Sequence, residues 1–151
     1  MKKWTSLLVV VFVGILLAII LIYSKGEVDK PNLTVFSFHY GSYNAGYYNY
    51  DITKIGESYL YVAIGQNGVE LDIEKEISSK DILKLEEIIS NHNIKSWDKF
   101  DENDKTTLDG NSFSLQIIYK DNKQINASGY MKYPSNYNEV HNELLKFFSG
   151  L

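Results

Sequence analysis

The feature that most constrains this chain is a long apolar run close to its start. Residues 7–22 read LLVVVFVGILLAIILI and carry no charge. With its neighbours, from 4 to 23, the stretch is about 20 residues long, and as a helix it would span about 30 Å, the thickness of a bilayer's hydrocarbon core. The sequence therefore predicts an N-terminal membrane anchor over residues 1–23, a polar tether over 24–32 and a single domain over 33–151.

The residues that flank the run agree with a signal-anchor that is not cleaved. Trp4 and Tyr23 occupy positions where aromatic side chains mark a membrane interface, with Lys2 and Lys3 before the run and Lys25 after it. The alternative is a cleaved signal peptide, whose apolar core is usually about 7–15 residues long and is followed by a pair of small residues that IYSKGEVDK does not offer. The chain has no Cys, so a lipid-modified cysteine cannot replace the helix as an anchor.

The charges of the chain bear on its orientation and its partners. Lys2, Lys3 and the amino terminus outweigh the lysines that follow the run, which favours a cytoplasmic N-terminus, a single pass through the membrane and a domain outside the cytoplasm. All basic residues are Lys, and Ile, Asn and Tyr are abundant, a bias typical of an AT-rich bacterial genome. With a net charge of −4 and no Arg, the chain is poorly suited to phosphate backbones, which excludes nucleic acid. The expected partners are the membrane lipid bilayer and an envelope protein.

Periodic segments bounded by turn residues predict an α+β fold. Strands are expected where β-branched and aromatic residues lie between turn residues, and helices where apolar residues recur every three or four positions. Asn67-Gly68 is a strong hairpin signal, and Ser78 with Asp81 resembles a helix-capping pair. The predicted elements are strands over 33–40, 46–55, 58–65 and 69–77, a helix over 78–93, strands over 112–119 and 124–131, and a helix over 137–148. The order β-β-β-β-α-β-β-α is satisfied most economically by an antiparallel sheet that packs two helices against one face.

The aromatic-rich stretch FSFHYGSYNAGYYNY, residues 36–50, divides into packing residues and candidate contact residues. Side chains alternate along a strand, so one group of rings shares a face and is expected to pack across a hairpin: Phe36, Phe38, Tyr40, Tyr48 and Tyr50. Tyr43 and Tyr47 lie in or beside the loop GSYNAG, where no amphipathic pattern requires burial. Exposed tyrosines on such a loop are typical of surfaces that contact proteins or sugars, and the alternative is that they cap the end of the sheet.

The C-terminal block carries a resemblance. Its pattern is Trp97 with Phe100, then Asp109-Gly110, then SFSL, and then ASGYMKYPSNY before the last predicted helix. This pattern resembles the C-terminal block of an uncharacterised group of small bacterial proteins that are often exported or membrane-tethered. The resemblance implies an α+β domain and supplies no activity and no catalytic residue. From the residues themselves, Trp97 has two interpretations, packing with Phe100 at the edge of the sheet or contact with a ligand.

No catalytic constellation is visible, so the sequence predicts a protein that is not an enzyme, with no catalytic residues and no cofactor. Without Cys, thiol chemistry is excluded, and His39, His92 and His141 lack the spacing of metal ligands. No G-x-S-x-G elbow or Gly-rich phosphate loop is present. The carboxylates fall on stretches whose pattern is that of solvated faces.

The acidic loop over 98–111 raises the question of a calcium site. An EF-hand loop that starts at Asp101 requires Gly at its sixth position and Glu at its twelfth, where this chain has Thr106 and Ser112. The motif fails, so no metal site is predicted. A looser set of carboxylate ligands from the same loop is the alternative to a solvated loop.

Together these observations predict a single-pass membrane-anchored protein of a bacterial envelope, with a non-catalytic interaction domain outside the cytoplasm. One alternative is a domain that binds a small ligand or a glycan, with Tyr43, Tyr47 and Trp97 as the candidate binding residues. The other alternative is an enzyme of a type that no motif reveals.

Overall fold

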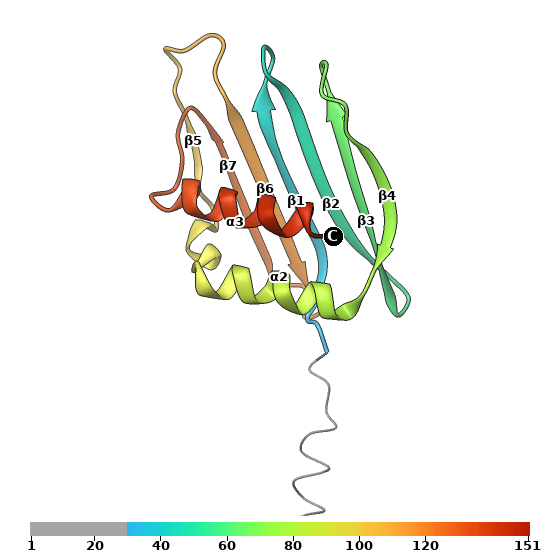
Figure 1. Cartoon of the computed structure of the whole chain (residues 1–151). Helices are drawn as coiled ribbons and strands as arrows, with labels where there is room; N and C mark the ends of the chain where they lie inside the picture. The colour runs from blue at the N-terminus through green and yellow to red at the C-terminus, as the bar shows by residue number, and fades with distance from the viewer. Residues whose placement is uncertain (1–29) are drawn as a thin grey trace, which may run out of the picture. The chain divides into compact units, whose positions relative to one another are not determined.

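Residues 30–151, the part of the chain that the computed structural model describes, form a seven-stranded sheet with helices on one face (Figure 1). The strand order is β4-β3-β2-β1-β6-β7-β5. Neighbouring strands are antiparallel, except that the short β5 runs parallel to β7. The strands are β1 (Leu33–Ser42), β2 (Gly46–Ile55), β3 (Ser58–Gln66), β4 (Asp72–Ile77), β5 (Asp101–Asn103), β6 (Ser112–Tyr119) and β7 (Gln124–Tyr130), and the helices are α2 (Ser79–Asn91), the 3-10 turn η1 (Ile94–Trp97) and α3 (Tyr137–Ser149).

The predicted α+β class and the predicted antiparallel sheet with two helices are confirmed for this part of the chain. The predictions for the anchor over 1–23, including Lys2, Lys3, Trp4, Tyr23 and Lys25, lie outside the described residues and stay predictions. None of the helices within residues 30–151 is both long enough and apolar enough to cross a membrane.

Two elements differ from their predicted form. The stretch over 94–111, for which no helix or strand is predicted between the helix over 78–93 and the strand over 112–119, contains η1 and β5, and β5 adds a strand to the edge of the sheet beyond β7. The fourth strand begins at Asp72 instead of residue 69, although Asn67 and Gly68 adopt the positive φ angles expected of the turn. The reason is that Val69 folds over two glycines: a Cβ atom on Gly65 or Gly46 would lie within 2.6 Å of a Val69 side-chain atom.

The aromatic pairing predicted for the first hairpin is confirmed by the register. Opposite residues on β1 and β2 are Phe36 and Ile52, Phe38 and Tyr50, and Tyr40 and Tyr48. The second hairpin also pairs as predicted, with Phe113 opposite Gly129, Leu115 opposite Ala127 and Ile117 opposite Ile125. These residues point to the face that α2 and α3 cover (Figure 1), and they form most of the core with Ile82, Leu85, Val140, Leu144 and Phe148 from the helices.

Side-chain hydrogen bonds fix where α2 begins and join it to the start of β1. Ser78 caps α2, and its capping box with Asp81 confirms the predicted pair. Further along α2, the Glu86 carboxylate accepts hydrogen bonds from the backbone N–H groups of Asn32 and Leu33, both at 2.6 Å. Helix α2 therefore holds the start of β1 by a charge-assisted pair of hydrogen bonds.

Candidate binding site on the open face of the sheet

The face of the sheet opposite the helices carries polar side chains on its central strands. Because side chains alternate along a strand, the residues between the core positions point to this open face. They are Asn49 and Asp51 on β2, Ser37 and His39 on β1, Ser114 and Gln116 on β6, and Asn126 and Ser128 on β7. The register aligns them in two rows across the strands: Asn49, His39, Ser114 and Ser128 in one, and Asp51, Ser37, Gln116 and Asn126 in the other.

Two adjoining hollows lie over these rows, one after the other along the strands. The first has a volume of about 520 Å³ and lies over Ser37, Gln116 and Asn126. The second has a volume of about 420 Å³ and reaches Tyr47 on β2 and Tyr130 on β7. Both are lined by His39, Ser114 and Ser128, so they form one continuous depression, which we name the open-face groove. Its size is in the range of ligand sites, about 300–1,000 Å³.

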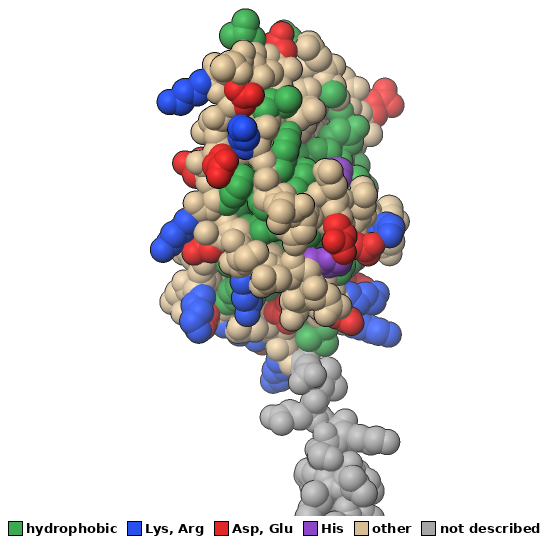
Figure 2. All heavy atoms as spheres, turned by 90° about the vertical axis from the view of Figure 1, so that its left-hand side faces the viewer, with side chains coloured by type: hydrophobic (Ala, Val, Ile, Leu, Met, Phe, Trp, Pro, Cys, Tyr) green, Lys and Arg blue, Asp and Glu red, His purple; other side chains and the backbone are tan. Residues whose placement is uncertain are grey.

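The segment from 98 to 103 forms one wall of the groove. It is held along β7 by hydrogen bonds from the Lys99 N–H to the Asn126 carbonyl (2.8 Å) and from the Ser128 N–H to the Phe100 carbonyl (2.8 Å). The Ser128 hydroxyl also donates to Asp101 at 2.8 Å. Figure 2 faces this edge of the molecule and shows acidic and basic side chains distributed over it, with hydrophobic side chains between them.

Lys99 lines the groove with its backbone in the left-handed region, at φ 66°. This conformation costs a residue with a Cβ atom on the order of 1 kcal/mol, and such strained positions cluster at functional sites. Here the hydrogen bond to Asn126 fixes it, and the Asn126 N–H in turn donates to Asp98 at 3.1 Å.

A histidine–carboxylate pair lies beside the groove. His39 Nε2 lies 3.0 Å and 3.2 Å from the two carboxylate oxygens of Asp51 on the neighbouring strand. Partial burial acts to raise the pKa of Asp51, but hydrogen bonds with His39 and Ser37 outweigh it and hold the pKa below its ordinary value. The site therefore presents a fixed carboxylate at neutral pH.

The His39–Asp51 pair resembles two members of a Ser-His-Asp triad, but the described residues do not complete the triad with a serine. A triad requires a serine hydroxyl hydrogen-bonded to the imidazole. Ser114 stands opposite His39 in the register, but no hydrogen bond joins the two side chains in the described part of the chain. The arrangement can offer hydrogen-bond donors and acceptors, the carboxylate of Asp101 in the lining, that of Asp51 beside it, and the ammonium of Lys99.

The three candidate binding residues from the sequence lie in different environments. Tyr43 stands at the tip of the β1–β2 hairpin and is 75% exposed. Tyr47 lines the upper part of the open-face groove. Trp97 is 1% exposed, packs edge-on against Phe113 at 5.9 Å and donates its indole N–H to the Asn136 side chain at 2.8 Å. The burial of Trp97 agrees with the packing interpretation and leaves it no surface to offer a ligand, so of the three only Tyr47 joins the groove.

Sequence reasoning missed most of the groove residues. The sequence did contain a signal for them, because polar residues alternate with the core residues along each strand. They are Ser37 and His39 on β1, Ser114 and Gln116 on β6, and Asn126 and Ser128 on β7. The position of Lys99 had no such signal, because it depends on β5 pairing with β7.

The acidic loop does not assemble carboxylates. Among residues 30–151 no group of three or more His, Cys, Asp or Glu side chains is arranged to hold a metal ion. Asp104 instead accepts hydrogen bonds from the Thr106 N–H (2.9 Å) and from the Thr106 and Thr107 hydroxyls. These bonds lower the pKa of Asp104 and shape the turn.

Fold and site together define a class: an α+β domain whose antiparallel sheet is covered by helices on one face and carries a polar groove on the other. No protein-family model matches the chain, and no curated protein matches it either. The residues of the groove are therefore the features from which a function can be inferred.

Proposed function

We propose that this chain is a non-catalytic binding protein of the bacterial envelope, anchored by its N-terminal segment, whose domain binds a glycan in the open-face groove. The observation that carries the proposal is the groove itself, which polar side chains from β1, β6 and β7 line and which has Tyr47 and Tyr130 at one end. The anchor and the outward orientation predicted from the sequence, with the resemblance of the C-terminal block, supply the expected location.

The chemistry of the lining suits a hydroxyl-rich ligand. Ser, Asn, Gln and His side chains both donate and accept hydrogen bonds, and each sugar hydroxyl does the same. The amide side chains of Gln116 and Asn126 are also matched to the N-acetyl groups of amino sugars. Tyr47 and Tyr130 at one end provide rings on which the apolar face of a sugar can lie.

The shape of the groove favours a chain over a compact molecule. It runs along neighbouring strands, and its two hollows share His39, Ser114 and Ser128. It is open along its length, so a polymer of the envelope can lie across it without an end having to enter.

The test is calorimetric titration of the full chain in lipid nanodiscs with soluble oligomers of N-acetylglucosamine and, as a second probe, of dextran. We expect saturable binding that is lost in the double variant Gln116→Ala, Asn126→Ala and retained in Asn91→Ala, an exposed amide on α2 on the other side of the sheet. Binding that survives the double variant, or no saturable binding of either oligomer at millimolar concentration, would refute the glycan groove.

A second candidate function is contact with an envelope protein through the hairpin tip. The observation in its favour is Tyr43, whose side chain is 75% exposed on a turn, because exposed tyrosines give contact area at low entropic cost. Comparing Tyr43→Ala with Tyr47→Ala separates the two functions. Loss of a protein partner from envelope extract in Tyr43→Ala, with oligosaccharide binding unchanged, would favour the protein contact.

A further inference from the structure

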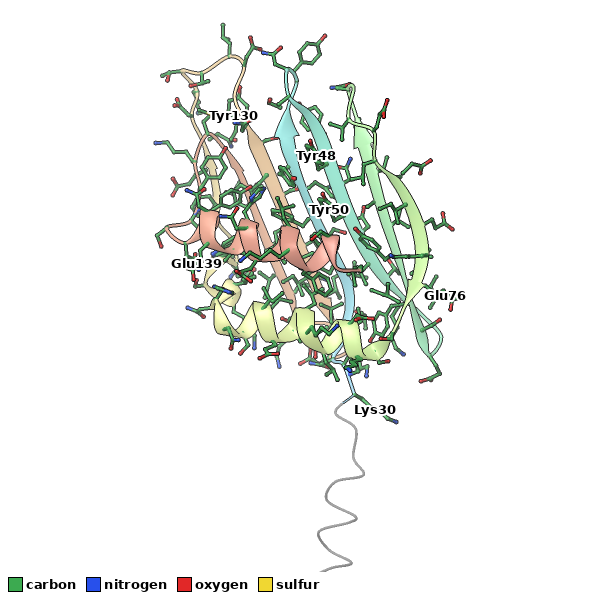
Figure 3. All side chains as sticks on the ribbon, in the orientation of Figure 1. Lys30, Tyr48, Tyr50, Glu76, Tyr130 and Glu139 are labelled. Carbon is green, nitrogen blue, oxygen red and sulfur yellow. The ribbon has the colours of Figure 1, made fainter. Side chains whose placement is uncertain are left out.

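A further hollow, separate from the two that form the open-face groove, lies on the helix-covered face above α3, and aromatic rings line it. Its volume is about 400 Å³. The rings are Tyr40 on β1, Tyr48 on β2, Tyr133 before α3, and Tyr137 and His141 on α3. Figure 3 labels Tyr48, which lies above α3 in that view. We name this set the aromatic hollow. It lies on the other side of the sheet from the open-face groove, although Tyr40 and Ser112 border both.

The rings of the aromatic hollow face in several directions. Tyr40 and Tyr48 are stacked, with centroids 4.9 Å apart and planes 7° apart. The His141 ring meets Tyr40 edge-on, at 4.5 Å and 81°. Tyr137 is tilted by 32° to His141 and by 36° to Tyr133. Rings on strands, on a loop and on a helix thus enclose one space from different sides.

Small residues keep the hollow open at the hairpin end. Gly41, Ala45 and Gly46 form its upper border. Gly41 has a φ of +141° and Gly46 a φ of +81°, conformations that favour glycine. A Cβ atom on Gly41 would lie 2.1 Å from the Gly46 carbonyl oxygen, so the turn itself requires the glycine and leaves no side chain to close the hollow.

The lining carries no formal charge at neutral pH. None of the described residues that border the hollow is Asp, Glu, Lys or Arg. Burial raises the pKa of Tyr40 and Tyr137, so both stay neutral phenols, and burial lowers the pKa of His141, which favours the neutral imidazole. The main electrostatic feature of this uncharged lining is therefore the quadrupole of its aromatic rings, whose faces carry partial negative charge.

We propose that the aromatic hollow binds a small quaternary ammonium compound, with its trimethylammonium group among the rings. Aromatic faces attract a cation within about 6 Å of the ring centroid, and aromatic cages are a recurrent way to recognise quaternary ammonium groups. A primary ammonium also needs hydrogen-bond acceptors for its three N–H groups, and the lining offers only neutral oxygens, such as those of Asn111, Ser112 and Asn138, and no carboxylate. A quaternary ammonium has no N–H groups to satisfy, and its methyl groups suit an apolar wall.

The experiment compares ligands that differ in one property. The full chain, in nanodiscs of phosphatidylglycerol so that no choline headgroup competes, is titrated with choline, with its neutral carbon isostere 3,3-dimethylbutan-1-ol and with ethanolamine. We expect choline to bind saturably, the neutral isostere to bind roughly 2- to 30-fold more weakly and ethanolamine to bind more weakly still. Equal binding of choline and the isostere would reduce the hollow to an apolar pocket, and the absence of saturable choline binding would overturn the proposal.

Matched variants test on which face of the sheet choline binds. Tyr48→Leu removes a half-buried ring and should weaken choline binding several-fold, whereas Tyr48→Phe keeps the ring and should keep the affinity within about 2-fold. Tyr47→Leu, the next residue on the other face, should leave choline binding unchanged. Thermal melting of each variant reports whether it folds. If Tyr48→Leu does not fold, the affinity of Tyr48→Phe for choline still tests whether the ring without its hydroxyl is sufficient for binding. Loss of choline binding in Tyr47→Leu with retention in Tyr48→Leu would move the site to the other face and refute the assignment.

Discussion

The two faces of the sheet are built from the same strands and differ in almost every property. β1 gives Phe36 and Phe38 to the helix-covered face, where both are fully buried, and Ser37 and His39 to the open face, where both are partly exposed. Period-two alternation therefore divides one short sequence between a core and a binding surface. The lesson is that stability and binding in the open-face groove can be altered almost independently, by choosing which face of a strand carries the substitution.

The helix-covered face is held by stacked rings. Phe148 of α3 lies between Tyr50 and Tyr61, with centroids 4.3 Å and 5.9 Å away and planes nearly parallel. Burial also raises the pKa of Tyr61 to about 12, so this ring stays neutral at physiological pH. On the open face the hydrogen-bonding groups lie at the surface, where water replaces any partner that is lost.

The largest expected effect is therefore on the helix-covered face. Phe148→Ala removes the ring that joins α3 to β2 and β3, and we expect it to lower the free energy of unfolding by about 3–5 kcal/mol. Denaturant unfolding of the full chain in nanodiscs, followed by far-UV circular dichroism, measures the change. Phe148→Leu is the control, which keeps much of the volume and should cost less. A loss below about 1 kcal/mol for the Ala variant would show that the ring stack contributes little.

The next effect concerns the junction at which β1 begins. Glu86→Ala removes the acceptor of the Asn32 and Leu33 N–H groups, and we expect a loss of about 1–3 kcal/mol, since hydrogen bonds to charged groups are worth more than neutral ones. Glu87→Ala is the matched control, because this neighbouring carboxylate is exposed and should change stability by less than about 0.5 kcal/mol. Equal effects of the two substitutions would show that the bonds at β1 do not hold the fold.

The two faces should also respond to acid in different pH windows. The pKa of His141 on the helix-covered face is lowered from 6.5 by burial, so its contribution to stability is present above pH 6.5 and is lost as the pH falls through the lower folded-state value. The pKa of Asp51 on the open face is also lowered, despite burial, by bonds with His39 and Ser37. Its contribution is present above pH 3.8 and is lost below it.

Melting temperatures measured across the range from pH 7 to pH 3 separate these two windows. His141→Phe keeps a ring against Tyr40 and should flatten the profile just below pH 6.5, and Asp51→Asn should flatten it below pH 3.8. A His141→Phe profile with the unchanged slope just below pH 6.5 would mean that another group titrates there.

How far the fold follows from the sequence depends on the range of the interaction. The pairing of Phe38 with Tyr50 and of Leu115 with Ala127 was predictable, because alternation fixes the face and short turns fix the register. The β5 strand was not, since Asp101–Asn103 has no strand composition and pairs with β7 only after the second hairpin exists. The shortened β4 was missed for a similar reason, because Val69 packs on glycines of β2 and β3.

The candidate site was less predictable than the fold. Tyr47 was found because its parity sets it apart from Tyr48. Ser37, Gln116 and Asn126 were unremarkable one by one, and they become a site only when β1 is placed beside β6 and β6 beside β7. The packing of α3 on the sheet brings His141 against Tyr40. Both proposed sites therefore depend on tertiary contacts, although the pairing of Tyr40 with Tyr48 follows from the hairpin pattern.

The smallest expected effect on stability belongs to the groove, and it tests the division between the faces most directly. Gln116 is exposed, and within residues 30–151 its side-chain amide donates only to the exposed Asn126, at 3.2 Å. Gln116→Ala should therefore change the free energy of unfolding by less than about 0.5 kcal/mol, because water replaces the lost partner. The same substitution removes one hydrogen-bonding group from the proposed glycan site and should weaken oligosaccharide binding by about 2- to 10-fold, as measured by calorimetry. A variant that lost stability and binding together would show that the polar side chains of the open face also stabilise the fold. Stability and groove binding could then not be altered separately by choosing which face of β6 carries the substitution.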